Sequence, residues 1–168
     1  MIVAVPHGPS VVQNGPVRIS AKADYAVRAA IALAEADDDE PVKAEAIAEA
    51  QEIPPRFLEN ILGELRHAGI VQSRRGAEGG YRLGRPADDI TIAEVIRAVD
   101  GPLATVRGDP ADRLDYRGAA VPLQEVWLAL RANIRQVLES VTLAAVVEGE
   151  LPPPVRDLAH HPEAGQPR

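Results

Sequence analysis

Residues 74–83 carry the side chains best suited to bind a polyanion. They read Arg-Arg-Gly-Ala-Glu-Gly-Gly-Tyr-Arg-Leu, so two arginines lead into a glycine-rich tip and an alternating strand leads out. Guanidinium groups supply charge and a planar fork of donors for phosphate oxygens, while glycine permits close approach. This composition predicts a β-hairpin that lies along a phosphate backbone or enters a minor groove. The alternative is an ordinary surface hairpin.

Other reactive chemistry is scarce in the chain. It contains no cysteine, which excludes disulfides, thiolate metal sites and cysteine-held iron–sulfur clusters. There is no Gly-x-Ser-x-Gly elbow, no phosphate-binding glycine loop and no paired-histidine metal motif. We therefore expect no enzyme, no metal site and no cofactor.

The distribution of charge matters more than its sum. The formal net charge is −7, which at first sight argues against a nucleic-acid partner. Residues 53–87, however, hold six arginines against three glutamates, and acidic residues gather in 35–40 and in the C-terminal third. A basic face on an acidic body is compatible with DNA binding, and its affinity should fall steeply with salt.

Three helices must position the hairpin. Ser20 is a suitable N-cap for a first helix, and a short second helix is expected over 43–50. A third helix should begin at Pro54-Pro55 and end before Gly69. Its apolar residues recur at steps of three and four, which predicts a buried stripe of Phe57, Leu58, Ile61, Leu62 and Leu65.

Two helices joined by a short turn and followed by an arginine-bearing hairpin predict a mostly α fold, a winged helix-turn-helix with a two-stranded β wing. Helix 55–67 would then enter the major groove and residues 74–82 would form the wing. Alternatively, the polar face of helix 55–67 is simply a solvated surface that contacts no DNA. The expected DNA-binding residues are Lys22, Lys43, Pro55, Arg56, Glu59, Asn60, Arg66, Arg74, Arg75, Gly76, Gly79, Gly80, Tyr81 and Arg82.

A longer C-terminal helix begins at Pro122 and carries a second apolar stripe. Its length and its single tryptophan favour a dimerisation helix between two subunits, because one DNA-binding head alone gives weak specificity. The alternative is a helix that caps the core of its own subunit. The expected dimerisation residues are Leu123, Val126, Trp127, Leu130, Ile134, Val137, Leu138 and Val141.

The order of these elements resembles the Rrf2 family of bacterial transcriptional regulators over most of residues 18–147. Each matching piece is short, but their order and spacing together are specific. The pieces are 18–29 (Arg-Ile-Ser-Ala-Lys-Ala-Asp-Tyr-Ala-Val-Arg-Ala), 53–62 (Ile-Pro-Pro-Arg-Phe-Leu-Glu-Asn-Ile-Leu), 69–71, 73–76, 79–83, 90–92, 98–102 and 141–143.

The resemblance implies a homodimer with an N-terminal winged helix and a long dimerisation helix behind it. The resemblance is to IscR- and NsrR-like members, and the members that bind a cluster carry three cysteines in the loop before the long helix. This chain has none at residues 103–114. Asp24 falls where some members offer a carboxylate to their cluster, but it has no cysteine partners here. We therefore expect a cysteine-free member without an iron–sulfur cluster.

The expected organisation is a disordered leader at 1–17, a winged-helix DNA-binding domain at 18–101 and an irregular effector-type loop at 102–121. A dimerisation helix region at 122–150 and a disordered Pro-rich tail at 151–168 follow. No apolar run reaches the roughly 18–20 residues that span a bilayer. Residues 1–5 lack the charged leader of a signal peptide, so the expected compartment is the cytoplasm without membrane contact.

These features predict a sequence-specific transcriptional repressor. It would bind a pseudo-palindromic operator in double-stranded DNA as a homodimer. The alternative is a winged helix used as a protein-interaction module without specific DNA binding. A small-molecule effector at residues 103–121 is left open, because nothing in that segment identifies a ligand.

Overall fold

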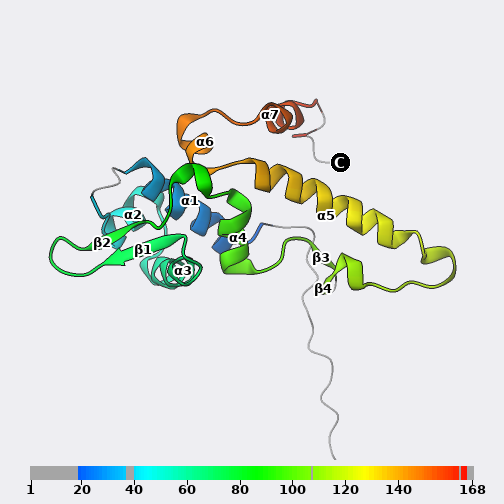
Figure 1. Ribbon diagram of the computed structural model, residues 1–168, viewed down its shortest axis with the longest axis horizontal. Coiled ribbons are helices and arrows are strands. Elements are labelled where there is room, and N and C mark those ends of the chain that lie inside the picture. Colours follow the sequence, from blue (N-terminus) through cyan, green and yellow to red (C-terminus); the bar gives the residue numbers. More distant parts are fainter. Residues whose placement is uncertain (1–18, 37–39, 107, 163, 166–168) are drawn as a thin grey trace, which may run out of the picture.

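The computed structural model describes residues 19–36, 40–106, 108–162 and 164–165, and in these it is mostly helical with two short antiparallel hairpins (Figure 1). The predicted fold class is confirmed. The elements are α1 (Ala21–Glu35), α2 (Ala44–Gln51), α3 (Pro55–His67), β1 (Val71–Arg74), β2 (Gly80–Leu83), η1 (Ala87–Asp89), α4 (Ile92–Asp100), β3 (Thr105–Val106), β4 (Asp109–Pro110), η2 (Ala111–Arg113), η3 (Gly118–Ala120), α5 (Leu123–Ser140), α6 (Leu143–Glu148) and α7 (Pro153–Ala159).

Helix α1 is the centre of the head, which comprises α1 to α4, β1, β2 and α6. It begins as predicted, because Ser20 Oγ accepts a hydrogen bond of 2.9 Å from the backbone N–H of Ala23. Four alanines and Leu33 make up its buried face. Side chains this small let α2, α3, α4 and α6 all pack closely around one helix. Aliphatic residues of these elements form one hydrophobic cluster.

Helix α3 has the predicted bounds and buries Leu58, Ile61, Leu62 and Leu65 against the rest of the head. The prediction that Phe57 belongs to this buried stripe is wrong, since its side chain is 57% exposed. Phe57 lies in the first turn of the helix, where it extends past the core. Its ring packs edge-to-face with that of Tyr25, with the ring centroids 6.4 Å apart.

The chain returns to the head after α5 through a backbone bridge beside α4. Ile92 N–H donates to the carbonyl oxygen of Val141, and Leu143 N–H donates to that of Ile90, both at 2.9 Å. Leu143 is fully buried in the hydrophobic cluster. Helix α6 is therefore part of the head, and the region predicted at 122–150 contains it in addition to the predicted long helix, which is α5.

Helix α5 extends away from the head, and its N-terminal end lies farthest from it (Figure 1). The loop before α5 holds the short hairpin β3–β4 and two turns of 3-10 helix, so it is less irregular than predicted. This loop lies along α5 through side-chain contacts. Gln124 Nε2 donates to Leu114 O at 2.9 Å, and Trp127 Nε1 donates to Tyr116 Oη at 2.9 Å.

The predicted disordered tail is wrong for Pro153–Ala159, which forms α7. Two prolines occupy its first positions, where their fixed φ and missing N–H suit a helix start. Helix α7 lies beside α5, and Val155, Leu158 and residues of α5 line a shared cavity. The predicted leader at 1–17 falls outside the described residues. Within the described part, no helix is long and apolar enough to cross a bilayer.

Candidate nucleic-acid interface

The polar face of α3 is turned to solvent because its apolar face holds the helix on the head. Arg56, Glu59, Asn60 and Arg66 are all exposed. Glu52 ends α2 in the left-handed conformation (φ 52°), and Ile53, 2% exposed, anchors the following turn. This short turn fixes the angle at which α3 follows α2, as a helix-turn-helix requires.

The wing is a four-residue ladder in which Val71 pairs with Leu83 and Arg74 pairs with Gly80. The outer edge of β2 is joined to the segment before α2, because Val42 and Tyr81 form an additional antiparallel bridge. The bend from β1 into the tip uses Gly76, whose φ of +109° favours glycine. The wing is thereby held at a set position beside α3.

Two glycines of the wing are required by packing within the protein. A Cβ at Gly79 would lie 2.4 Å from the carbonyl oxygen of Arg74, and one at Gly80 would lie 2.6 Å from that of Val42. Both contacts are with backbone atoms, which a side chain cannot displace cheaply. Packing within the protein therefore requires glycine at both positions, whether or not they approach DNA closely.

A concave surface of about 620 Å³ lies between α3, the wing and the start of α2, and we call it the wing groove. Glu45 and Ser73 also line it; they were not among the residues predicted for the site, although Ser73 precedes the two arginines in the sequence. Arg66 Nη1 reaches Ser73 Oγ at 3.4 Å, which bridges α3 and β1 across the groove. The predicted residues that line the groove are Lys43, Glu59, Arg66, Arg74, Arg75, Gly76, Gly79, Gly80 and Tyr81.

The remaining predicted DNA-binding residues lie outside the wing groove. Asn60 lines a second hollow, on the other side of α3, together with Lys22. Arg82 reaches Gln72 Oε1 at 3.3 Å, and strand alternation places both on the face of the wing opposite Tyr81. Pro55 and Arg56 are exposed at the N-terminal end of α3.

Lys22 has partners inside the protein. Its ammonium group donates to the carbonyl oxygen of Val99 at 2.8 Å and pairs with Glu64 at 2.7 Å. These contacts join α1 to α3 and α4 at half-exposed positions. The side chain is therefore already engaged, and its predicted role in DNA binding has to compete with these bonds.

The predicted dimerisation residues divide into two groups in this chain. None of the residues of α5 is buried, and Val126 and Leu130 are 54% and 36% exposed. An 18-residue helix with an exposed apolar stripe is typical of a surface that a partner covers. Val141 differs, because it lies after α5 and is buried in its own subunit, where its carbonyl oxygen accepts from Ile92.

Together the helix-turn-helix, the wing and the exposed basic groove define a winged-helix protein of the transcription-regulator class. The chain belongs to the Rrf2 family: residues 19–149 match the family model, which is described as an iron-dependent transcriptional regulator. The predicted family is thus confirmed.

Relatives support the same assignment. Rv1287 of Mycobacterium tuberculosis H37Rv, named as an HTH-type transcriptional regulator, is 52% identical over 143 residues, which cover 85% of this chain and 89% of that protein. The HTH-type transcriptional regulator CymR of Bacillus subtilis is 34% identical over 141 residues, covering 80% and 94%. These relatives are transcriptional regulators, not enzymes.

Solved structures confirm the fold. The structure of CymR, the global cysteine regulator of B. subtilis, has a TM-score of 0.68 at 32% identity, and the match covers 80% of this chain and 98% of that one. The structure of IscR from T. potens has a TM-score of 0.65 at 33% identity, covering 79% and 87%.

The iron in the family description raises the question of whether this chain could hold a cluster. The whole sequence contains no cysteine, so it has no thiolate ligands to offer. Asp24 pairs with Arg28 at 3.0 Å, and no group of three or more His, Asp and Glu residues suited to a metal ion occurs in the described part of the chain. The residues present do not fit a cysteine-held iron–sulfur cluster.

Proposed function

We propose that the protein is a sequence-specific DNA-binding repressor that acts in the cytoplasm as a homodimer on a pseudo-palindromic operator. The observation that carries this proposal is the wing groove. There Lys43, Arg66, Arg74 and Arg75 surround a concave surface bordered by the exposed face of α3. Cationic side chains gathered beside an exposed helix are suited to phosphate contacts next to the major groove that the helix enters.

Within this proposal, α3 and the wing have different tasks. Helix α3 enters the major groove, which is about 12 Å wide and admits one helix. Glu59 accepts from a cytosine amino group and Asn60 pairs with an adenine edge. Arg74 and Arg75 contact the backbone or the adjacent minor groove, where a guanidinium group is favoured by the negative potential.

The homodimer is supported by α5. Val126 and Leu130 of its stripe are exposed in the single subunit, and an operator of two half-sites requires two heads at a fixed separation. The predicted interface is Leu123, Val126, Trp127, Leu130, Ile134, Val137 and Leu138. Leu138 also packs against the core of its own subunit. The proposal includes no iron–sulfur cluster, because the chain offers no thiolate.

The experiment that tests this function is selection of bound fragments from sheared genomic DNA with the purified, full-length protein, followed by sequencing. The expected result is enrichment of fragments that share two inverted half-sites, with centres separated by about one helical turn of 10–10.5 base pairs or a multiple of it. Recovery of fragments without a common sequence would contradict specific binding. It would favour the interaction-module alternative.

A further inference from the structure

A pocket on the side of the head away from the wing groove carries the strongest unassigned chemistry. It lies between the C-terminal end of α4 and the middle of α5, has a volume of about 490 Å³, and we call it the α4–α5 pocket. Arg97, Arg131, Arg135 and Glu139 line it, together with the turn at 101–103. This volume falls within the range of small-molecule sites, about 300–1,000 Å³.

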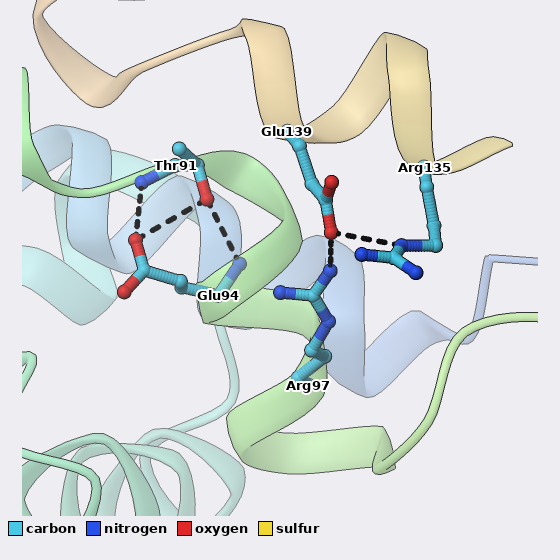
Figure 2. A network of polar contacts seen from close by, with 5 residues as sticks. All are labelled: Thr91, Glu94, Arg97, Arg135 and Glu139. Carbon is cyan, nitrogen blue, oxygen red and sulfur yellow. Dashed lines mark hydrogen bonds and ion pairs between the residues drawn. The ribbon is translucent and has the colours of Figure 1, made fainter. Parts of the chain in front are cut away.

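The arginines of the α4–α5 pocket outnumber its carboxylates. Arg97 of α4 and Arg135 of α5 both donate to the same oxygen, Oε1 of Glu139, the latter from Nε at 3.0 Å (Figure 2). Arg131 pairs with Asp112 at 2.7 Å. Three guanidinium groups therefore share two carboxylates, and each arginine carries five N–H donors of which these contacts use few.

In this pocket the carboxylate of Glu139 is the anionic group that pairs with Arg97 and Arg135. Hydrogen bonding to Arg135 lowers the pKa of its carboxyl, burial opposes this, and the Arg97 hydrogen bond lowers it further, with a net lowering. The carboxylate is thus ionised at neutral pH and held by one helix against the other. All four side chains remain partly exposed, so a molecule from solution can reach them.

We propose that the α4–α5 pocket is an effector site for a small anion with two or more negatively charged oxygens, which displaces Glu139 from Arg97 and Arg135. Guanidinium groups recognise carboxylate and phosphate oxygens by the same paired donors, so both classes share the required chemistry. An ion pair at a partly exposed site is weak and therefore exchangeable. A multivalent anion can contact Arg97, Arg131 and Arg135 at once, whereas Glu139 Oε1 accepts from Arg97 and Arg135 while Arg131 pairs with Asp112.

Displacement of Glu139 removes an ion pair that joins α4 to α5. Because α5 supplies the proposed dimer interface and α4 belongs to the head, occupancy changes how the two heads are held. This effect of the bound anion on the two heads is the regulatory half of the proposal, and it rests on the proposed function. Binding of the anion does not, so the two are tested separately.

Binding is tested by isothermal titration calorimetry of the full-length protein with citrate, a polycarboxylate, and with pyrophosphate, in a low-chloride buffer. We expect saturable binding of at least one of them. The double variant Arg97→Gln/Arg135→Gln should weaken it at least tenfold, and Glu139→Gln should strengthen it several-fold because the competing carboxylate is gone. Arg156→Gln, an arginine of α7 outside the pocket, is the control and should bind as the wild type does.

Opposite signs for the arginine and glutamate variants separate a binding site from a structural ion pair. Loss of binding in Glu139→Gln, equal binding in all variants, or no binding of either probe would overturn the proposal. Circular dichroism shows whether each variant is folded, and Arg131→Gln replaces the double variant if that one unfolds. With binding established, an unchanged affinity for selected DNA at saturating anion would overturn the regulatory half alone.

Discussion

Val42 and Tyr81 exchange two backbone hydrogen bonds, one in each direction and each 2.8 Å long. They lie 39 positions apart in sequence, and the bridge joins the outer edge of β2 to the segment before α2. Strand β2 is consequently held by β1 on one edge and by the segment that precedes α2 on the other. This explains why a hairpin with an open, glycine-containing tip still keeps a fixed position beside α3.

Gly80 is adjacent to this bridge, and replacing it should disturb the wing. In Gly80→Ala the new methyl group would lie 2.6 Å from the carbonyl oxygen of Val42, so the backbone must shift. We expect a loss of about 1–3 kcal/mol in the free energy of unfolding, measured by urea denaturation, together with weaker DNA binding.

The matched control is Gly63→Ala in α3. Apart from the adjacent residues and the helix's own backbone, no atom lies within 4 Å of the Cβ that this change would add. Alanine is the better helix former, so stability should rise by about 0.5–1 kcal/mol. The same sign for both substitutions would contradict the packing argument.

Arg75 lines the wing groove and is predicted to contact a phosphate. Arg75→Ala should weaken binding to every DNA sequence. It should also reduce the slope of log K against log salt by about 0.9, the change expected for one lost phosphate contact. Fluorescence anisotropy at several salt concentrations measures this slope. An unchanged slope would remove Arg75 from the phosphate contacts.

Asn60 is predicted to read a base, so its replacement should have a different signature. Asn60→Ala should cost about 1–3 kcal/mol on the selected sequence and relax the preference at one position of each half-site. Competition between the selected site and single-base variants measures this. Equal losses on all of these sequences would argue for a backbone role instead.

The apolar stripe of α5 should control assembly. Val126→Glu/Leu130→Glu places two charges in the predicted interface and should shift the protein from dimer to monomer in analytical ultracentrifugation. Leu128→Glu is the control, because Leu128 is also exposed (39%) but lies roughly 200° around the helix from both sites. A dimer that persists in the double variant, or dissociates in the control, would place the interface elsewhere.

Glu94 should make stability depend on pH. Burial raises the pKa of its carboxyl, but hydrogen bonds from the Thr91 backbone and from Arg85 outweigh burial, and the net pKa is lowered. A folded-state pKa below the unfolded one means that ionised Glu94 stabilises the fold above the unfolded pKa, and that this contribution is lost as pH falls through the folded pKa.

Glu94→Gln should therefore lower stability at pH 7 and lose less stability than the wild type between about pH 5 and pH 3. Glutamine still satisfies the capping box with Thr91, so the start of α4 is preserved. Glu148→Gln, at an exposed glutamate of α6, makes the same change of charge and is the control. Parallel profiles for wild type and Glu94→Gln would contradict the linkage.

Much of the head could be predicted from local signals. Ser20 caps α1, prolines begin α3, and the left-handed Gly69 follows its end, so these bounds follow from backbone chemistry. The wing arginines and Lys43 could also be predicted as neighbours, because a helix-turn-helix followed by a hairpin brings them to one side of α3.

The remaining features depend on contacts between distant segments. The apolar pattern of α5 includes Val141 in sequence, and the backbone bonds to Ile90 and Ile92 are what place that residue in the head before the chain continues as α6. The α4–α5 pocket joins Arg97 to residues some 40 positions later, which no local pattern indicates. The internal role of Gly80 is hidden in the same way, since its neighbour is Val42.

The most direct test of the central claim is fluorescence anisotropy on a DNA fragment from upstream of the protein's own gene, or on a fragment selected from the genome. Excess unrelated DNA is present at two salt concentrations, and the wild type is compared with Arg74→Gln/Arg75→Gln. A specific regulator should resist the competitor, bind more weakly at the higher salt, and lose affinity in the double variant. Binding that the competitor abolishes on both fragments would contradict sequence-specific regulation by this protein.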